Sequence, residues 1–167
     1  MKAEAPQPAD SLSPPHSSLS RFLRYWLPVL LWMSIIFSIS TDAGSTRHTS
    51  RIIVPLLRWL NPGVTEETIG RVQYAVRKGA HMAEYAILAV LLWRARRQPV
   101  PGEAHSWQSN EASFALGITI AFAVSDEIHQ AFVPSREGRV GDVFIDSAGA
   151  ALGLLALWLI GRWRKRW

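Results

Sequence analysis

Residues 124–153 decide how the chain is interpreted, and they read V-S-D-E-I-H-Q-A-F-V-P-S-R-E-G-R-V-G-D-V-F-I-D-S-A-G-A-A-L-G. An apolar helix ends in a group of ionisable side chains, turns through Pro134 and Gly138, and leads into a second apolar helix that carries Asp142 and Asp146. A hairpin that only crosses a bilayer needs no such group at its tip, because charged side chains inside a membrane are costly. We therefore expect two membrane-spanning helices here, with the functional residues at the end where they join.

The composition places the chain among small membrane proteins. Its 167 residues are enough for one domain. Hydrophobic residues make up 49%, and long apolar runs alternate with arginine-rich segments. The net charge of +5 would suit a nucleic-acid-binding protein, but the basic residues stand at the ends of apolar runs, where they set membrane topology. The absence of cysteine excludes disulfides, thiolate catalysis and cysteine-bound metals.

Four apolar segments predict membrane-spanning helices, because about 20 apolar residues cross the hydrocarbon core. They are residues 22–39, 74–93, 112–133 and 143–161. The first could instead belong to a cleaved signal peptide with a cleavage site at Ser38 and Ser40, but the long tail and the long apolar run favour a retained helix. Residues 1–20 are rich in proline and serine and are expected to form a disordered cytoplasmic tail. Residues 21–163 would form the transmembrane domain and residues 164–167 a basic cytoplasmic end.

The connection between the first two spans carries a helix of its own. Apolar residues recur there at helical spacing, with Arg51 and Arg58 between them: Ile52, Ile53, Leu56, Leu57 and Leu60. This pattern predicts an amphipathic helix that lies on the membrane surface or against the bundle. Thr65 followed by Glu66 and Glu67 marks the start of the next helix. The expected fold is an all-α membrane protein with four transmembrane helices plus an amphipathic helix in the first outer loop.

The positive charges give the expected orientation. With both termini in the cytoplasm, ten of the 18 Lys and Arg residues fall on the inner side and eight on the outer side. The inner ones stand directly at the ends of spans, and Trp26, Trp93 and Trp163 mark one shared interface. We therefore expect a multi-pass membrane protein with its N-terminus and C-terminus in the cytoplasm.

This topology brings one end of every span to the outer side of the membrane. The polar and ionisable residues at those ends are Thr41, Asp42, Lys78, His81, Glu84, Tyr85, Asp126, Glu127, His129, Gln130, Asp142 and Asp146. Several of them stand three or four residues apart and therefore share a helix face. The fourth span continues into Gly149 and Gly153, whose spacing lets two helices approach closely. These patterns predict a polar, partly buried pocket that opens to the outer leaflet.

Candidate roles follow from the chemistry of these side chains. Groups suited to proton transfer are the candidate catalytic residues His81, Glu84, Asp126, Glu127 and His129. Donors and charged groups suited to substrate binding are Lys78, Tyr85, Gln130, Arg136, Asp142 and Asp146. Plainer interpretations stand beside these roles. Asp142 is also placed to cap the fourth helix, His81 and Glu84 to form a structural hydrogen bond, and Arg136 and Arg139 to be solvated in the turn.

Three kinds of chemistry fit this set of residues. Imidazole and carboxylate at helical spacing predict a divalent-metal site at His81, Glu84, Asp126 and His129. Basic residues would instead hold a phosphate or pyrophosphate, with a carboxylate or histidine as general base, and these are Lys78, Arg136 and Arg139. Alternatively, the network is purely structural and locks the helices together. The sequence contains no Ser-His-Asp pattern, P-loop or Rossmann glycine run, and it leaves open whether the protein is an enzyme.

At these residues the sequence resembles the VanZ-like family of small bacterial integral membrane proteins, over about residues 25–160. The motifs that carry the resemblance are, in chain order, Lys78-x-x-His81-x-x-Glu84-Tyr85, Asp126-Glu127-x-x-Gln130, Pro134-x-Arg136-x-Gly138, and Asp142-x-x-x-Asp146. Asp146 stands where the family often has asparagine, and this difference adds a negative charge at that position.

The resemblance implies a role in the bacterial cell envelope, since the member that names the family is associated with low-level teicoplanin resistance within a glycopeptide-resistance system. We expect a protein of the bacterial inner membrane whose outer-leaflet pocket acts on a lipid-linked or phosphate-bearing envelope substrate. The expected partners are membrane lipids and lipid-linked cell-wall intermediates or a glycopeptide, with no nucleic acid. The alternative is a non-enzymatic membrane module that binds an antibiotic, a lipid or a partner, or whose polar cluster only locks the helices together.

Overall fold

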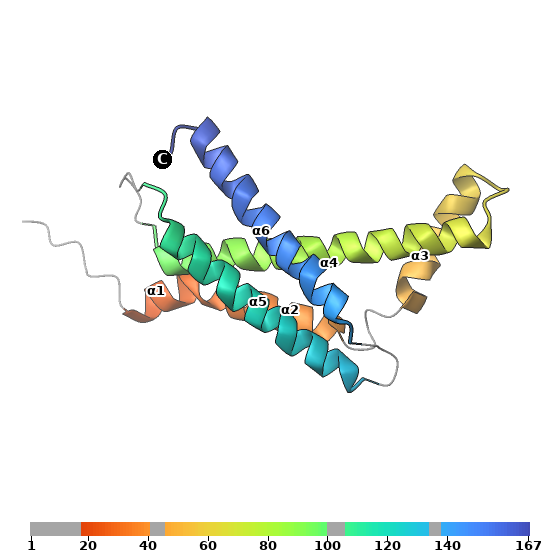
Figure 1. The fold of residues 1–167 in the computed structure, drawn as a ribbon, viewed down its shortest axis with the longest axis horizontal. Coiled ribbons are helices and arrows are strands. Elements are labelled where there is room, and N and C mark those ends of the chain that lie inside the picture. Colours follow the sequence, from red (N-terminus) through yellow and green to blue (C-terminus); the bar gives the residue numbers. More distant parts are fainter. Residues whose placement is uncertain (1–17, 41–45, 100–105, 134–137) are drawn as a thin grey trace, which may run out of the picture.

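The computed structural model describes residues 18–40, 46–99, 106–133 and 138–167. These residues form six helices and no strand, which confirms the all-α class (Figure 1). The helices are α1 (Ser18–Tyr25), α2 (Leu27–Ser40), α3 (Thr46–Leu60), α4 (Glu66–Arg97), α5 (Ser109–Ala131) and α6 (Val140–Trp163). Residues 1–17 of the expected tail lie outside the described residues, as do the predicted site residues Thr41, Asp42 and Arg136.

Helix α4 is the element on which the other five helices pack (Figure 1). It begins where the sequence predicts, because the Thr65 side chain caps the helix by accepting a hydrogen bond from the backbone N–H of Thr68 at 3.2 Å. The segment expected as the second span, residues 74–93, is only the middle part of this helix. No proline stands between residues 66 and 97, so the helix continues for 32 residues. At about 1.5 Å per residue this is about 48 Å.

Helix α6 crosses α4 at close range because glycines face the contact (Figure 1). A Cβ atom on Gly149 would lie 2.7 Å from the Cα of Met82, and one on Gly153 would lie 2.8 Å from the carbonyl oxygen of Ala86. A side chain at either position would collide with the backbone of α4, so only glycine fits without a shift. The close-packing role predicted for this pair of glycines is confirmed.

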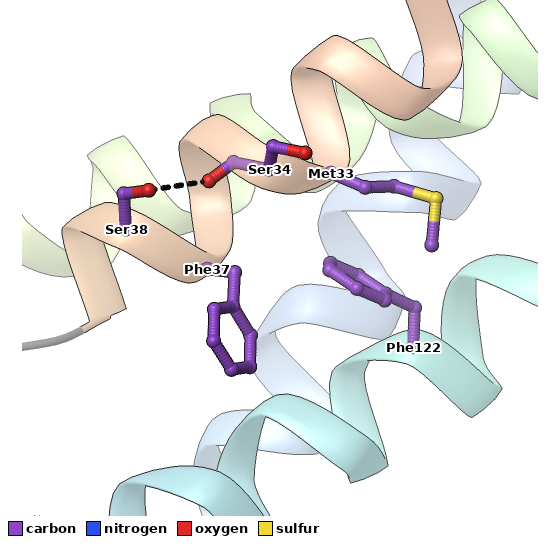
Figure 2. Close-up of a pocket in the computed structure, with 5 residues that line it drawn as sticks. All are labelled: Met33, Ser34, Phe37, Ser38 and Phe122. Carbon is purple, nitrogen blue, oxygen red and sulfur yellow. Dashed lines mark hydrogen bonds between the residues drawn. The ribbon is translucent and has the colours of Figure 1, made fainter.

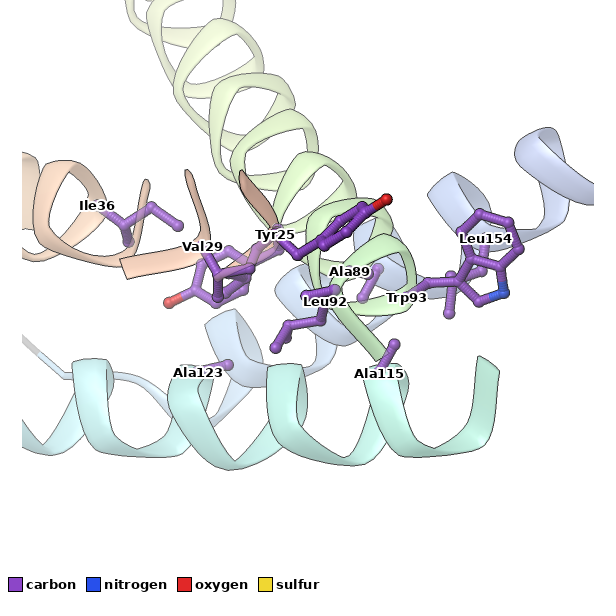
Figure 3. Packing of buried hydrophobic residues seen from close by; sticks show 13 residues of the cluster. Tyr25, Val29, Ile36, Ala89, Leu92, Trp93, Ala115, Ala123 and Leu154 are labelled. Atoms are coloured by element: carbon purple, nitrogen blue, oxygen red, sulfur yellow. The ribbon is translucent and has the colours of Figure 1, made fainter. Parts of the chain in front are cut away.

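Apolar side chains from α2, α4 and α5 fill the space between these helices (Figure 3). Val29, Ile36 and Leu92 are buried there together with the small residues Ala115 and Ala123. Many other large apolar side chains are exposed on α2, α5 and α6, among them Leu30, Leu31, Ile35, Ile118, Leu152, Leu155 and Leu159. Exposed apolar surface of this extent is typical of a region that contacts a membrane or a partner.

One described helix, α6, is long and apolar enough on its own to cross a membrane. Helices α1 and α2 would together add a second span if they form one unit, but the chain bends by 41° between them. The single helix expected at residues 22–39 is therefore broken. Its break lies at Trp26 because Pro28 has no N–H to donate to the carbonyl of Arg24, and the proline ring crowds that carbonyl.

Helices α4 and α5 do not meet the same criterion, so the structure does not show the four transmembrane helices that the sequence predicts. Helix α4 carries Lys78, Glu84 and Arg94 in and beside its apolar part, and the apolar part of α5 lies between Glu111 and Asp126. Polar side chains near the ends of these two helices shorten their apolar runs. Counting residues on both sides of those charges as one apolar run therefore overstates the length of each span.

Helix α3 confirms the predicted amphipathic helix and packs against the first half of α4 (Figure 1). The Gln73 amide donates a hydrogen bond to the Ser50 hydroxyl at 3.1 Å, and Arg58 pairs with Glu66 at 2.6 Å. The other face of α3 exposes large apolar side chains at helical spacing, namely Ile52, Leu56, Trp59 and Leu60. One face of α3 therefore belongs to the bundle, and the other has no partner among the described residues.

Candidate functional site at the polar end of the bundle

The helix ends expected to meet do so in the structure. The C-terminal ends of α2 and α5 come together with the middle of α4 and the start of α6 (Figure 1). They place ten polar residues at one end of the bundle, called here the polar-end cluster: Ser40, Lys78, His81, Glu84, Tyr85, Asp126, Glu127, Gln130, Asp142 and Asp146. All ten are buried or half-buried.

Asp126 on α5 is the centre of a buried hydrogen-bond network. Its Oδ2 atom accepts hydrogen bonds from the Ser40 hydroxyl at 2.7 Å, the Tyr85 hydroxyl at 3.2 Å and the Gln130 amide at 3.0 Å. The donors lie on α2, α4 and α5, so one carboxylate oxygen joins three helices. Asp126 is only 1% exposed, and its other oxygen, Oδ1, accepts no hydrogen bond from the described residues.

Lys78 on α4 forms an ion pair with Asp142 on α6. The two side chains are 18% and 20% exposed, so the pair is partly shielded from solvent. Helix α6 begins with Arg139 as its N-cap residue, and therefore the interpretation of Asp142 as the cap is wrong. Asp142 lies in the first turn instead, where a negative charge also suits the helix dipole. The pair fixes the start of α6 against the middle of α4.

His81 lies between two carboxylates. Its Nδ1 atom is 3.8 Å from Oε2 of Glu84 and 3.9 Å from Oδ1 of Asp146. Both distances exceed those of a hydrogen bond, so the structural hydrogen bond considered for His81 and Glu84 is not formed by these atoms. The three side chains instead form one acid–base group that spans α4 and α6.

Asp146 and Glu127 are buried carboxylates with unsatisfied oxygen atoms. Asp146 is 1% exposed, and neither of its oxygens accepts a hydrogen bond from a described residue. Oε2 of Glu127 accepts a hydrogen bond from the backbone N–H of Arg139 at 2.7 Å, whereas Oε1 has no donor among the described residues. Folded proteins satisfy most of their buried polar atoms. The cluster is therefore more polar than the packing of the helices requires.

The polar-end cluster also holds an excess of negative charge. The charges that act on Asp146 include the carboxylates of Glu127, Asp142 and Asp126 and the ammonium group of Lys78, and the His81 imidazole lies 3.9 Å away. Lys78 is already paired with Asp142. The other carboxylates consequently repel one another in a site that water reaches poorly.

A groove lies between α2 and α5 (Figure 2). It has a volume of about 320 Å³ and is lined by Met33, Ser34, Phe37, Ser38 and Phe122. The serine hydroxyls do not make the groove polar, because each donates to a carbonyl of its own helix: Ser34 to Leu30 at 2.8 Å and Ser38 to Ser34 at 2.7 Å. The groove is thus apolar, unlike the polar pocket that the sequence predicts.

Two aromatic contacts extend from this groove, one to His129 and one to Tyr85 of the polar-end cluster. The Phe37 ring stacks on the imidazole of His129, with ring centroids 4.1 Å apart. The Phe122 ring lies 6.3 Å from the ring of Tyr85, whose hydroxyl donates to Asp126. One wall of the groove therefore contacts Tyr85, which binds the buried carboxylate of Asp126.

Residues 25–161 match the VanZ/LLP1 family. The match covers most of the chain, including every residue of the polar-end cluster and of the groove. The chain belongs to the VanZ/LLP1 family. No match is found among curated proteins or among solved structures. Together with the apolar helix α6, membership of VanZ/LLP1 indicates a membrane protein.

In this VanZ/LLP1 chain the four residues predicted as metal ligands do not converge on one point, because they contact different neighbours. His81 and Glu84 meet Asp146, whereas Asp126 binds Ser40 and His129 stacks on α2. Across residues 18–40, 46–99, 106–133 and 138–167, no three His, Asp or Glu side chains are close enough to hold one metal ion. The described part of the chain therefore gives no support to the expected set of His81, Glu84, Asp126 and His129.

The VanZ/LLP1 structure also shows functional candidates that sequence reasoning missed. From the sequence, Ser40 is named only as part of an alternative cleavage site, yet its hydroxyl donates to Asp126 across 86 residues of sequence. The residues of the groove follow the apolar pattern of an ordinary span. Nothing in the sequence indicates which face of α2 meets α5, so neither the groove nor the role of Ser40 could be found in advance.

Proposed function

We propose that this chain is a multi-pass protein of the bacterial inner membrane with four membrane-crossing segments and both termini in the cytoplasm. The exposed apolar side chains of α2, α5 and α6 support this proposal, because a lipid environment would cover them. Arginines close α4 and α6 at the ends opposite the polar-end cluster: Arg94, Arg96, Arg97, Arg162 and Arg164 (Figure 1). Basic residues at one level are typical of the cytoplasmic side, and this supports an outer location for the cluster.

The proposed role of the polar-end cluster is to bind or act on an envelope component, in a function related to glycopeptide (teicoplanin) resistance. The observation that carries this proposal is the set of buried carboxylate oxygens that no described residue satisfies, on Asp126, Glu127 and Asp146. Buried ionisable groups at membrane depth are expensive and usually mark a functional site. A lipid-linked or phosphate-bearing substrate would bring its headgroup to this level of the membrane.

A second candidate function is purely structural, and specific contacts favour it. Oδ2 of Asp126 joins α2, α4 and α5, and the Lys78–Asp142 pair joins α4 to α6. These contacts would lock the four helices even if no ligand entered the cluster. The two candidate functions predict different effects when one charge is removed at constant shape.

The test expresses the wild type and single variants in a susceptible Gram-positive host and records teicoplanin susceptibility beside membrane abundance. The informative variants are His81→Ala, Glu84→Gln and Asp126→Asn. A matched control is Glu67→Gln, which makes the same carboxylate-to-amide change at a side chain that is 75% exposed.

A functional site predicts that the wild type and Glu67→Gln protect the host, while the three cluster variants lose protection at unchanged abundance. A structural lock predicts that Asp126→Asn reduces the amount of protein in the membrane, and that protection falls only in proportion. If the wild-type protein gives no protection, the proposed role in resistance is wrong. If the cluster variants protect as well as the wild type, the cluster is not the site of this function.

A further inference from the structure

We propose that the polar-end cluster binds the primary ammonium group of a single-chain amphiphile whose hydrocarbon chain lies in the groove between α2 and α5. This inference rests on the proposed function, because it names a ligand class for the same cluster, and within that function it replaces the phosphate-bearing substrate by a cationic one. Four observations carry it: unsatisfied acceptors, uncompensated charge, the spacing of the carboxylates and the apolar groove.

The unsatisfied atoms of the cluster's carboxylates are all acceptors. They are Oδ1 of Asp126, Oε1 of Glu127 and both carboxylate oxygens of Asp146, on residues that are at most 6% exposed. An ionised carboxylate accepts hydrogen bonds and donates none. A partner for these groups in their ionised form must supply donors, and a primary ammonium group supplies three donors and no acceptor.

The charge of the cluster favours a cation over a phosphate. The carboxylates of Glu127, Asp142 and Asp126 all act on Asp146, while Lys78 is held by Asp142 and the His81 imidazole lies 3.9 Å from Asp146, beyond hydrogen-bond distance. An anionic headgroup would add repulsion at this point, whereas an ammonium group would relieve it. Hydrogen bonds between an ammonium group and a carboxylate are also among the strongest available in a poorly solvated site.

The spacing of the carboxylates favours an organic cation over a metal ion. No three acidic or imidazole groups of the described residues are close enough to share one metal ion. Metal–oxygen bonds are about 2.0–2.2 Å long, whereas ammonium–carboxylate hydrogen bonds are about 2.7–2.9 Å between heavy atoms. An ammonium group needs no such set of ligands around it, because a hydrogen bond to a single carboxylate is enough to hold it.

The groove indicates that the cation is attached to a hydrocarbon chain. Its lining offers apolar surface and serine hydroxyls that are already bonded within α2 (Figure 2). Phe122 in its lining contacts Tyr85, whose hydroxyl donates to Asp126 of the cluster. A sugar or a hydrated ion would find no partner along this path, but an alkyl chain would. We therefore expect the chain to enter from the membrane and the ammonium group to meet Asp126 first.

The experiment uses the full chain in phosphatidylcholine nanodiscs and dodecylamine with a photoactivatable diazirine in its alkyl chain. Dodecanol with the same diazirine is the uncharged control, and labelled residues are mapped by mass spectrometry. We expect the amine to label Met33, Phe37 and Phe122 several-fold more than Leu155 and Leu159, which are exposed on α6. Dodecanol should label the two surfaces to similar extents.

Two kinds of variant test the cluster and the groove separately. Asp126→Asn and Asp146→Asn should lower labelling of the groove by the amine to the level of dodecanol. Ser38→Trp should fill the groove and lower its labelling, while Ile35→Trp, at an exposed position outside the groove, should not. Ser38→Trp changes an exposed side chain, so it keeps the test decisive if either aspartate variant fails to fold. Phosphatidylethanolamine should not compete, because its phosphate would approach the carboxylates.

Several results would overturn the inference: equal labelling of the groove and α6, equal labelling by amine and alcohol, or no effect of the aspartate and Ser38 variants. Each leaves the proposed function intact as long as Asp126→Asn still abolishes teicoplanin protection at normal abundance. Selective labelling of the groove combined with full teicoplanin protection by Asp126→Asn would support the ligand inference and contradict the proposed resistance function. The inference would then stand for a ligand unconnected with resistance.

Discussion

Asp126 shows how a single side chain can organise one end of a membrane bundle. Three donors from α2, α4 and α5 converge on one of its oxygens, and the whole residue is buried. Because each donor would otherwise be an unsatisfied buried group, the four side chains stabilise one another. The other oxygen accepts no hydrogen bond from the described residues.

The first prediction concerns Tyr85, which is fully buried and donates to Asp126 at 3.2 Å. Tyr85→Phe keeps the ring and removes only the hydroxyl, so we expect a loss of stability of about 1 kcal/mol. The measurement is thermal unfolding of the purified protein in detergent micelles. Tyr74→Phe, at a half-exposed position on the same helix, is the control and should be neutral. Equal stability of the two variants would show that this hydrogen bond contributes nothing.

The contact between α4 and α6 depends on two glycines rather than on large apolar side chains. Gly149 and Gly153 stand four residues apart on α6, and Met82 and Ala86 stand four apart on α4. The two backbones therefore approach along one stripe. This contact places Asp142 opposite Lys78 and Asp146 opposite His81.

A glycine-to-alanine comparison tests this close approach. Gly149→Ala places a methyl group against the backbone of Met82 and should cost roughly 1–3 kcal/mol through overpacking. Gly117→Ala on α5 meets no atom within 4 Å and should be neutral, or stabilising by about 0.5–1 kcal/mol through higher helix propensity. Stability in micelles and the amount of folded protein in the membrane give the comparison. Tolerance of both changes alike would contradict the close approach.

Helix α3 supplies a prediction about the membrane surface. The exposed fractions of Ile52 and Trp59 are 74% and 77%, and both lie on the face turned away from α4. We expect this face to enter the lipid headgroup region, where tryptophan and flanking arginines are favoured. Since the chain has no cysteine, a nitroxide can be placed by Ile52→Cys or Trp59→Cys alone.

In nanodiscs both labels should be relaxed more by oxygen than by a water-soluble nickel chelate. A label at Glu67→Cys, which is exposed near the start of α4, should show the reverse. Access of the nickel chelate to all three labels would place α3 in water. Shielding of the α3 labels from both reagents would instead indicate a protein partner.

The two ends of the whole molecule differ in chemistry. The polar-end cluster is acidic, whereas the opposite end packs arginine among aromatic rings. There the Arg97 guanidinium lies 5.0 Å from the Trp93 ring centroid and 5.7 Å from that of Trp167, and it pairs with Glu111 at 3.3 Å. Trp107 stacks on Trp93 and completes this group. Such an amphipathic belt beside basic residues suits the cytoplasmic interface of a membrane.

The orientation of the whole molecule is open to a direct test. Glu67→Cys should react with a membrane-impermeant maleimide on intact cells, because it lies on the outer side in the proposed topology. Arg164→Cys, at the end of α6, should react only after the membrane is opened. The parent chain, which lacks cysteine, gives the background. Reaction of both variants on intact cells would contradict a cytoplasmic C-terminus.

The sequence by itself determined the helices, their polar faces and the family, because these depend on local patterns. The start of α4 at Thr65, the glycine pair of α6 and the gathering of Lys78, His81, Asp126 and Asp142 at one end could all be predicted. The break at Trp26 could have been predicted from Pro28, but the apolar run hides it. The number of membrane spans could not be fixed, since α4 and α5 place charges inside their apolar runs.

Only the tertiary structure decided which side chains meet. Asp126 reaches Ser40 across 86 residues and Lys78 reaches Asp142 across 64, whereas His129 stacks on Phe37 instead of joining His81. The physical reason is that helical spacing fixes the face on which a residue lies but not the rotation and crossing of that helix against its neighbours. Those are set by close packing, here by glycines of α6 against the backbone of α4, and this packing leaves the cluster with buried oxygens that no described residue satisfies.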